Sequence, residues 1–341
     1  MNKEGNVYTI IFASIMVIIV GGLLAFIASS LRPAQIGNVK NEKMRNILEA
    51  IDPSFEGDEL AAMKRKEVEK LFSQHVKKRI ILNAKGEVVS ELNSEDPIEK
   101  GNEKDAFNLN PRDQYAKISN IKKECEGDDE CVTQKLIEQE IHAPMFVCEL
   151  KGKKIYVAHF SGKGLWDDIW GYAGIKPTRN INAAVFDHKA ETPGLGSKIT
   201  EDWFQNQFIG KTMANKKDEY KPISVKKPGL ETNKYEVNGI SGATFTGNGV
   251  AEMMARALKA THNYMEKNVE PVESPYKAEE TEKSLSVNSD NIQGFSLSGG
   301  YTLKGDTLLW GDGTYAVVTY VDENRLLVKE EGKEFTTVYT K

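Results

Sequence analysis

The stretch from Ile240 to Gly249 holds the residues of this chain best suited to carry a phosphate-bearing group. Small residues and hydroxyls gather there, namely Ser241, Gly242, Ala243, Thr244 and Thr246. A helical pattern starts just after them, near Gly247, and the N-terminus of a helix favours negative charge. The small residues of this stretch therefore leave room for a bulky phosphate group against the backbone, and the Thr244 hydroxyl is its predicted point of attachment.

Two other glycine-containing segments precede this loop. The first runs from Gly162 to Asp167 and the second from His188 to Gly196. Each by itself is typical of a turn, because glycine clusters usually mark turns. His188 invites a catalytic assignment, but nothing in the pattern requires proton transfer. His188 and Glu191 also make no metal motif without further ligands. We therefore expect neither a catalytic residue nor a metal site here.

These segments lie in a region, Lys154 to Tyr264, that alternates strand signals with one long helix. Strands are expected at Ile155–Ala158, Ala183–Phe186 and Tyr235–Val237, and a short helix at Asp202–Phe208. Further on, one apolar helical face is formed by Val250, Met253, Met254, Ala257, Leu258 and Thr261. Such a stripe is typical of a core-facing helix rather than of a cofactor site.

The N-terminus predicts a membrane anchor. No residue between Glu4 and Arg32 is charged, and Val7 to Leu31 is dominated by apolar residues and glycine. A bilayer core of roughly 30 Å needs about 20 such residues in a helix, so this run can span it with some tilt. A cleaved signal peptide is the alternative, since Ala28-Ser29-Ser30 resembles a cleavage site. Because the run exceeds the roughly 7–15 apolar residues of a signal peptide, we expect a retained single-pass helix.

Two helices and a hairpin are expected between the anchor and the strand region. Helical patterns cover Asn41–Ile51 and a charged segment from Asp58 to about Lys77. Arg79–Leu82 and Glu87–Val89 flank turn residues and predict a β-hairpin. The polar segment Asn93–Asp113 is typical of a loop.

The cysteines are too few for a disulfide scaffold. Cys125 and Cys131 bracket the acidic tip 126–130, which lacks the ligand spacing of a calcium loop. We interpret it as a solvated loop, closed by a disulfide if the domain lies in an oxidising compartment. Cys148 falls in an expected strand, Met145–Leu150, and is expected to be a buried, inert thiol.

The pattern of the C-terminal part predicts a linker and a small antiparallel meander. Its strands are expected at Thr307–Trp310, Tyr315–Val321, Leu326–Lys329 and Thr336–Tyr339. We divide the chain into an anchor (1–33), a helical and hairpin region (34–150), the domain with the glycine segments (151–266), a linker (267–290) and a β-rich extension (291–341). The expected fold class is α+β. A net charge of −5 with mixed signs provides no basic field for nucleic acid.

Together, the order and wording of the three glycine segments resemble a known family, the FMN-binding domain. This domain occurs in the C-type subunit of Na+-translocating NADH:quinone reductases and in the G-type subunit of the related Rnf electron-transport complex. The resemblance covers Lys154 to about Tyr264 closely and extends to the anchor in general plan. It implies FMN joined by a phosphoester bond to the last threonine of the S-G-A-T motif, here Thr244, with Thr246 as the second candidate. The family usually has an acidic residue three places before the serine, where this chain has Asn238.

The resemblance also implies how neighbouring residues serve the flavin. Apolar cover for the isoalloxazine ring would come from Leu165, Trp166 and Leu195. Hydrogen-bond donors would come from the amides of Gly164, Gly194 and Gly196 and from the Thr192 hydroxyl.

Two charged residues of these segments have open roles. Lys163 would add a counter-charge to the phosphate or remain solvated, and Glu191 would hydrogen-bond within its own loop or contact the flavin. A threonine hydroxyl is a poor nucleophile unaided, and no base is adjacent in sequence. A separate flavin transferase that donates the FMN part of FAD is therefore expected.

By this resemblance, the chain is expected to be an electron-transfer subunit of a sodium-pumping NADH:quinone oxidoreductase. It has no nucleotide fingerprint for NADH and one expected span, so NADH oxidation, ubiquinone reduction and sodium transport are expected in partner subunits. A G-type FMN carrier of an Rnf complex is one alternative. A non-redox, membrane-anchored assembly module with the same fold is another.

The resemblance places the flavin domain on the periplasmic side of the inner membrane, with lipid around the anchor. The flanking charges disagree, because Arg32, Lys40, Lys43 and Arg45 outnumber Lys3 and the α-amino group and favour a cytoplasmic C-terminal bulk. Charge bias weakens for large translocated domains, so we expect the periplasmic placement.

Overall fold

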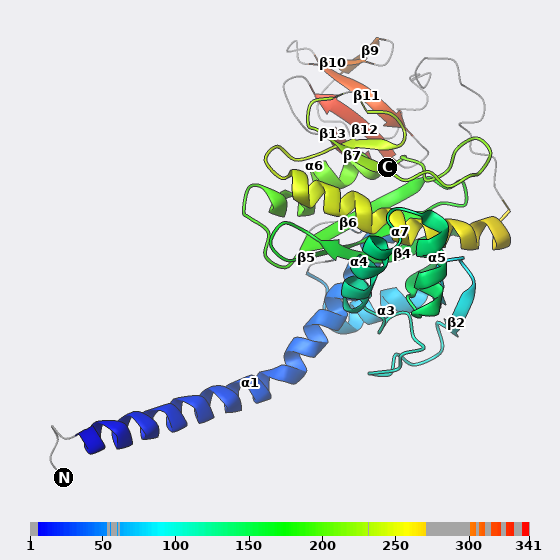
Figure 1. Cartoon of the computed structure of the whole chain (residues 1–341). Coiled ribbons are helices and arrows are strands. Elements are labelled where there is room, and N and C mark those ends of the chain that lie inside the picture. The colour runs from blue at the N-terminus through cyan, green and yellow to red at the C-terminus, as the bar shows by residue number, and fades with distance from the viewer. Residues whose placement is uncertain are drawn as a thin grey trace.

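A long helix leads into a body of mixed helices and strands. The computed structural model describes residues 6–52, 55, 60, 62–230 and 232–270, and the strands at 301–304, 307–310, 315–321, 325–330 and 336–340. Helix α1 (Asn6–Ile51) extends away from the body (Figure 1). Its most apolar window has a mean hydropathy of 2.9 and is wholly exposed, so by length and composition α1 can cross a membrane.

The anchor and the helix expected at Asn41–Ile51 form one continuous element, although the sequence pattern predicted two. Pro33 lies inside this helix. A proline removes one backbone hydrogen bond and crowds the preceding turn. Side chains on both sides of Pro33 are exposed, so α1 can absorb the distortion without disturbing a packed core.

Six antiparallel strands form the central sheet, in the order β2-β1-β3-β4-β5-β6. They are β1 (Val76–Leu82), β2 (Val88–Asn93), β3 (Ala143–Leu150), β4 (Lys153–Lys163), β5 (Asp168–Ile175) and β6 (Ile181–His188). The hairpin expected around residues 83–86 is confirmed as β1 and β2. Strand β5 was not expected. It begins where the segment Gly162–Asp167 ends.

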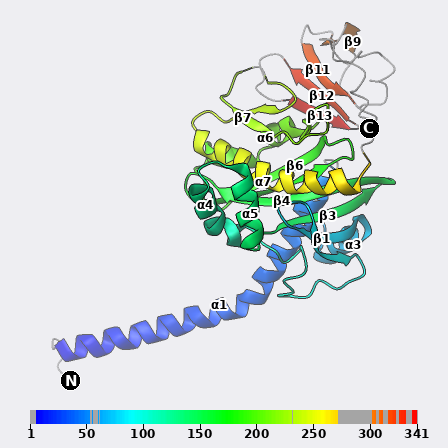
Figure 2. The ribbon, with the colours of Figure 1, turned by 45° about the vertical axis from the view of Figure 1, so that its right-hand side comes forward.

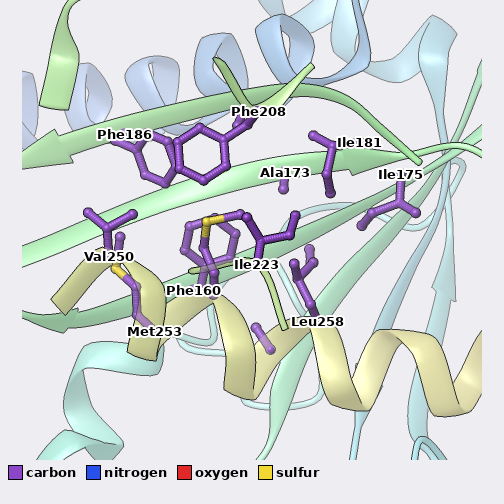
Figure 3. Close-up of a cluster of buried hydrophobic side chains, with 14 of the residues drawn as sticks. Phe160, Ala173, Ile175, Ile181, Phe186, Phe208, Ile223, Val250, Met253 and Leu258 are labelled. Carbon is purple, nitrogen blue, oxygen red and sulfur yellow. The ribbon is translucent and has the colours of Figure 1, made fainter. Parts of the chain in front are cut away.

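Both faces of the sheet are buried, because successive side chains of a strand point to opposite sides. Helix α7 (Thr244–Asn268) covers one face, where Met253 and Leu258 lie opposite Phe160 (Figure 3). The apolar stripe of this helix is therefore core, as expected. The C-terminal part of α1 and helix α3 (Arg65–His75) cover the other face, which includes Val157.

An insertion between β2 and β3 packs beside α7 (Figures 1 and 2). It contains the 3-10 turn η2 (Pro111–Gln114) and helices α4 (Tyr115–Glu124) and α5 (Asp129–Glu138), none of which was expected from the sequence. Ion pairs join it to α7, from Lys122 to Glu252 at 2.6 Å and from Lys259 to Asp129 at 3.2 Å. The insertion is therefore held against the helix that begins at Thr244.

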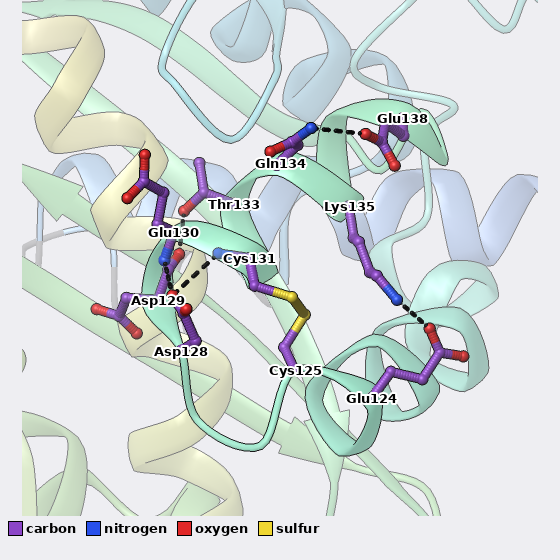
Figure 4. The surroundings of a disulfide bond; sticks show 10 residues. All are labelled: Glu124, Cys125, Asp128, Asp129, Glu130, Cys131, Thr133, Gln134, Lys135 and Glu138. Atoms are coloured by element: carbon purple, nitrogen blue, oxygen red, sulfur yellow. Dashed lines mark hydrogen bonds and ion pairs between the residues drawn. A yellow bond between two sulfur atoms is a disulfide. The ribbon is translucent and has the colours of Figure 1, made fainter.

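A disulfide between Cys125 and Cys131 joins the end of α4 to the start of α5 (Figure 4). Asp128 caps α5, because its Oδ1 accepts the amide hydrogens of Glu130 at 2.8 Å and Cys131 at 3.1 Å. The acidic tip was expected to be a loop throughout. Its last residues instead begin a helix, since a carboxylate at the N-cap satisfies free helical amides.

Short elements complete the body between β6 and α7. They are η3 (Gly196–Thr200), α6 (Asp202–Gln205), η4 (Asn206–Phe208) and the parallel strands β7 (Ser224–Lys226) and β8 (Glu236–Asn238). The short helix expected at 202–208 is present as α6 followed by a 3-10 turn. The strand expected at Tyr235–Val237 appears as β8.

The C-terminal antiparallel meander is confirmed, with one strand more than the four expected, as a separate sheet in the order β13-β12-β11-β10-β9. Its strands are β9 (Tyr301–Lys304), β10 (Thr307–Trp310), β11 (Tyr315–Val321), β12 (Arg325–Glu330) and β13 (Thr336–Thr340). The sheet lies beyond α6 and β7, at the end of the body away from α1 (Figure 1).

The α+β fold class is confirmed, and two expected boundaries change. The charged helix expected from Asp58 to Lys77 is described as α3 from Arg65, and Val76 and Lys77 already belong to β1. The backbone turns extended there because β1 pairs with β3. Most of the linker expected at 267–290 lies outside the described residues, while α7 continues to Asn268.

Candidate functional site

Thr244 is the first residue of α7 and is exposed. The sequence pattern predicted a helix start near Gly247, but the Gly247 amide already donates to the Ala243 carbonyl at 2.9 Å. The N-cap residue is Ala243, whose methyl side chain cannot accept hydrogen bonds from the first-turn amides. The first-turn amides of a helix have no partner within it, so the start of α7 offers hydrogen-bond donors to an anion.

The turn before α7 depends on Gly242, which has φ +77°. Residues with a Cβ rarely adopt this conformation. The turn closes through a 3.0 Å bond from the Ala243 amide to the Ile240 carbonyl, and Ser241 is exposed beside it. The loop can therefore reverse direction and still leave Thr244 facing solvent.

The buried carboxylate of Glu191 brings the three glycine segments together. Its Oε1 accepts the backbone N–H of Trp166 at 3.0 Å, and its Oε2 accepts the Thr246 hydroxyl at 2.6 Å. Glu191 is 5% exposed and Thr246 is 1% exposed. Glu191 was expected to bond within its own loop or to contact flavin. Its side chain instead joins two other loops.

Glycines make this convergence possible. A Cβ on Gly164 would overlap Glu191 Oε1, and a Cβ on Gly196 would overlap Glu191 Oε2. The Gly196 Cβ would also lie 2.7 Å from the Thr246 hydroxyl oxygen. Gly164 and Gly196 therefore leave room for the Glu191 carboxylate, in addition to their role in turns.

Exposed apolar side chains lie on the three glycine segments, and we call Leu165, Trp166, Leu195 and Phe245 the apolar rim. Phe245 follows Thr244 directly in the chain, and Leu195 lies against Gly242. Their exposed fractions are 46%, 66%, 41% and 70% respectively. The Trp166 indole N–H donates to the Thr192 hydroxyl at 2.9 Å, which links two of the segments. Phe245 was not among the expected site residues, although its position next to Thr244 was a usable signal.

Two of the expected amide donors are already used inside their turns. The Gly164 amide donates to the Asp167 carbonyl at 2.8 Å, and the Gly194 amide donates to the Ser197 hydroxyl at 3.0 Å. Gly194 has φ +75°, so it serves as a turn residue. The expectation that these two amides face a flavin is therefore not supported, because tight turns close through their own N–H groups.

Lys163 points toward two acidic residues of its own turn. Its Nζ lies 3.8 Å from Asp167 Oδ1 and 3.9 Å from Asp168 Oδ1. The pKa of Asp167 is lowered to about 2, chiefly by its hydrogen bond from Lys189, whose ammonium lies 2.9 Å away. The expected role of Lys163 as a phosphate counter-charge thus competes with these carboxylates.

Two polar side chains near the site accept hydrogen bonds from backbone amides. His188 Nδ1 accepts the Glu191 amide at 3.2 Å, which starts the loop that carries Glu191. Asn238, the departure from the family pattern, uses its Oδ1 to accept the Leu230 amide at 3.2 Å. An aspartate could accept the same bond, so the asparagine keeps this local geometry.

The geometry fits a phosphate ester that bears a flat aromatic group. An exposed hydroxyl stands at an uncapped helix N-terminus, where negative charge is favoured. The apolar rim offers contact surface to an aromatic ring close by. Thr246 is unsuited to attachment, because its hydroxyl is buried and donates to Glu191.

Comparison with known proteins supports an FMN-binding domain. Residues 164–259 match the model of the FMN-binding domain family. The chain is 24% identical over 260 residues to the C-type subunit of the Na+-translocating NADH-quinone reductase of Haemophilus ducreyi, covering 73% of this chain and 88% of that one. It is 37% identical to the corresponding subunit of Vibrio alginolyticus over 91 residues, which are 26% of this chain and 35% of that one.

A solved structure shares the fold. The crystal structure of the C-type subunit from Parabacteroides distasonis matches with a TM-score of 0.52 and 28% identity, over 69% of this chain and 96% of that one. The resemblance seen in the sequence is thus confirmed. The region that matches the family model contains Trp166, Glu191, Thr244 and Thr246, the residues that the fold brings together.

Proposed function

We propose that this chain, which resembles the C-type subunit of the Na+-translocating NADH-quinone reductases, is an electron-transfer subunit of such a complex and carries FMN on Thr244. The family match and the named relatives support the assignment. The single observation that carries the flavin site is the exposed Thr244 at the uncapped start of α7, beside the apolar rim.

Attachment to Thr244 is a transfer reaction with FAD as the donor. A bond forms between Thr244 Oγ and the phosphorus of the FMN half, and the pyrophosphate P–O bond to the AMP half breaks. AMP leaves, and the hydroxyl proton passes to a base of the transferase. No electrons change hands. The exposure of Thr244 allows a transferase to reach it, whereas the buried Thr246 is shielded.

The chain's own residues then hold the ester in place. First-turn amides of α7 stabilise the negative charge of the diester, as helix N-termini do for phosphates. The apolar rim covers part of the ring and excludes water from it. Bound FMN supplies the electron chemistry, and the protein supplies orientation and electrostatics.

The placement of the domain is also part of the proposal. Helix α1 would cross the inner membrane, with the α+β body on the periplasmic side. The bond between Cys125 and Cys131 supports this side, because disulfides persist in oxidising compartments such as the bacterial periplasm. Quinone reduction, NADH oxidation and the sodium path would belong to partner subunits.

The test is Thr244→Ala in the full chain, co-expressed with a flavin transferase. We expect normal membrane insertion and complete loss of in-gel flavin fluorescence after denaturation. Mass spectrometry of the peptide containing Ser241 to Arg256 should find one FMN in the unsubstituted protein and none in the variant. Thr133→Ala on α5 is the matched control and should keep the flavin.

The results separate the possible outcomes. A variant that stays fluorescent would move the attachment to another residue. An unsubstituted chain that carries no flavin beside an active transferase would reject the redox assignment in favour of a non-redox module. Co-purification with an Rnf-type complex would replace the quinone reductase assignment while keeping the flavin site.

A further inference from the structure

We propose that Glu191 is the positioning residue of the flavin site, holding the Trp166 loop and the first turn of α7 in register without touching the flavin. This inference rests on the proposed function and adds to it a role that the family match does not assign. We call the Glu191 carboxylate with its bonds to Trp166 and Thr246 the clamp. Its physical content is a single carboxylate that connects two segments 80 residues apart, Trp166 and Thr246.

Each oxygen of this carboxylate serves a different loop. Oε1 receives the Trp166 amide at 3.0 Å, and Oε2 receives the Thr246 hydroxyl at 2.6 Å. Hydrogen bonds to an ionised acceptor are shorter and stronger than neutral ones. Because Glu191 is 5% exposed, water has little access to replace either bond. The two loops are therefore coupled through one side chain.

The surroundings are shaped for this side chain. Gly164 and Gly196 both lack the Cβ that would overlap the Glu191 carboxylate. The His188 ring nitrogen accepts the Glu191 amide at 3.2 Å, which fixes the backbone from which the side chain projects. A larger residue at either glycine, or a shorter residue at 191, would remove the contact between the loops.

The clamp bears on both functional parts of the site. Thr246 lies in the same first turn as Thr244, so its bond to Glu191 fixes how that turn faces the rest of the site. Trp166 belongs to the apolar rim, and the hydrogen bond from its backbone N–H to Glu191 fixes the backbone from which its side chain projects. Glu191 thus acts through Trp166 and Thr246 to set the position of Thr244 relative to the apolar rim.

Substitutions can separate geometry from charge. In Glu191→Gln the amide oxygen can accept the Trp166 N–H, and the Thr246 hydroxyl can rotate to accept from the amide nitrogen. This variant loses the charge and keeps both bridges. Glu191→Ala loses both hydrogen bonds. Thr246→Val loses the bond to Thr246 and leaves Glu191 Oε2 buried without a partner. Thr246→Ser keeps the hydroxyl and therefore keeps that bond.

The first measurement needs no flavin. Hydrogen exchange is followed in the peptide 163–169 of the full chain made without a transferase. Glu191→Ala should raise exchange at the Trp166 amide by about ten- to hundredfold, because a hydrogen bond to a charged group is lost. Glu191→Gln should stay within about threefold of the unsubstituted chain. Equal protection in Glu191→Ala would overturn the clamp.

The second measurement is covalent FMN per protein after co-expression with the transferase. We expect at most about a tenth of the normal yield for Glu191→Ala, a clear loss for Thr246→Val, and near-normal yields for Glu191→Gln and Thr246→Ser. Exposed Glu266 at the far end of α7 gives the control Glu266→Ala, which should be unchanged. If Glu191→Ala fails to fold, Thr246→Val and its serine rescue decide the question.

The failures of the two proposals are distinguishable. An unsubstituted chain without flavin rejects the Thr244 proposal, while the exchange data still judge the clamp. A flavinylated unsubstituted chain whose Glu191→Ala variant is equally flavinylated rejects the clamp alone. A Glu191→Gln variant that loses flavin as fully as Glu191→Ala would assign Glu191 a charge role and overturn the positioning role.

Discussion

Residues without side chains set the dimensions of the candidate site. The Gly196 position faces both Glu191 and Thr246 at distances that exclude a methyl group. Gly164 faces the other oxygen of the same carboxylate. The closeness of the three loops therefore depends on what is missing from these positions as much as on the polar groups that meet there.

Gly196→Ala tests this at the residue scale. The new methyl group would push Glu191 away from Thr246, so we expect a loss of stability of about 1–3 kcal/mol and a reduced yield of covalent flavin. Thermal unfolding and in-gel fluorescence measure the two effects. Gly152→Ala is the control, because it strains an exposed turn with φ +76° but brings no atom within 4 Å of the new Cβ, and it should keep its flavin.

The sequence indicated which residues form the site, but not how they are joined. Thr244, Trp166 and Thr192 could be singled out because their types suit an ester and an aromatic ring. The partners of Glu191 lie 25 and 55 positions away in the chain, and no local pattern connects them. The amides of Gly164 and Gly194 close their own turns, and turn closure depends on backbone angles that residue types do not report.

At the scale of elements, the contact between α1 and the sheet joins the anchor to the body. Gly174 on β5 lies so close to the end of α1 that a Cβ there would overlap the Ala50 carbonyl oxygen. The Asn182 side chain on β6 donates to the Ile51 carbonyl at 2.5 Å. The Asn182 bond satisfies one of the carbonyls at the C-terminus of α1, which have no partner within the helix.

Gly174→Ala should therefore loosen α1 from the sheet. We expect faster hydrogen exchange across residues 44–51 and a loss of stability of about 1–3 kcal/mol, as for an overpacked core. Flavin attachment should be retained, because the site lies at the α7 side of the sheet. Gly152→Ala serves again as the control and should leave exchange in α1 unchanged. Unaltered exchange in Gly174→Ala would show that α1 is held by other contacts.

The elements that were not expected from the sequence have physical explanations. Strand β5 contains Gly171 and Gly174, which interrupt a strand pattern, yet both are needed where Phe160, Phe186 and α1 approach the backbone. The hairpin of β1 and β2, the stripe on α7 and the C-terminal meander were predictable, since each follows a local period with turn residues at its ends. Insertion helices α4 and α5 were missed because polar and charged residues together outnumber the apolar ones in each.

On the scale of the whole molecule, ionisable groups are placed where α1 meets the body. Burial, together with the nearby Asp202, raises the pKa of Glu49 to about 7, against the opposing effect of Arg45. Burial lowers the pKa of Lys43 to about 7, partly offset by Asp105. Lys43 Nζ also lies 5.2 Å from the centre of the Phe107 ring. We therefore expect the docking of the C-terminal part of α1 on the body to depend on pH.

The sign of the effect follows from Glu49. Its usual pKa is 4.5, so between pH 4.5 and 7 the folded state holds a proton that the unfolded state releases. Stability should fall as pH rises through this window and stay lowered above it. Glu49→Gln should remove that loss, with a gain on the order of 1–3 kcal/mol at pH 8 and little change at pH 4. Denaturant unfolding of the detergent-solubilised chain at both values measures it, and a gain of equal size at pH 4 would refute the titration.

The Lys43 contribution has the opposite sign and a different range. Its usual pKa is 10.5, so the unfolded state binds more protons between pH 7 and 10.5 and stability rises with pH there. Lys43→Met should flatten that rise and leave the slope between pH 4.5 and 7 intact. Denaturant unfolding across both ranges measures the Glu49 and Lys43 contributions separately, and an unchanged rise above pH 7 in Lys43→Met would contradict the Lys43 contribution.

The side of the membrane on which the body lies can be tested with its own cysteines. If the body is periplasmic, Cys125 and Cys131 should be oxidised in intact spheroplasts. A membrane-impermeant reductant should then make Cys131, the more exposed of the two, reactive to an impermeant maleimide polymer. Burial raises the pKa of the Cys148 thiol, so Cys148 should stay unlabelled until denaturation and serves as an internal control. A cytoplasmic body would instead show two thiols that are reduced from the start, with Cys131 labelled only after lysis. That outcome would reverse the proposed orientation and agree with the charges that flank α1, while the flavin proposal at Thr244 would still be tested separately.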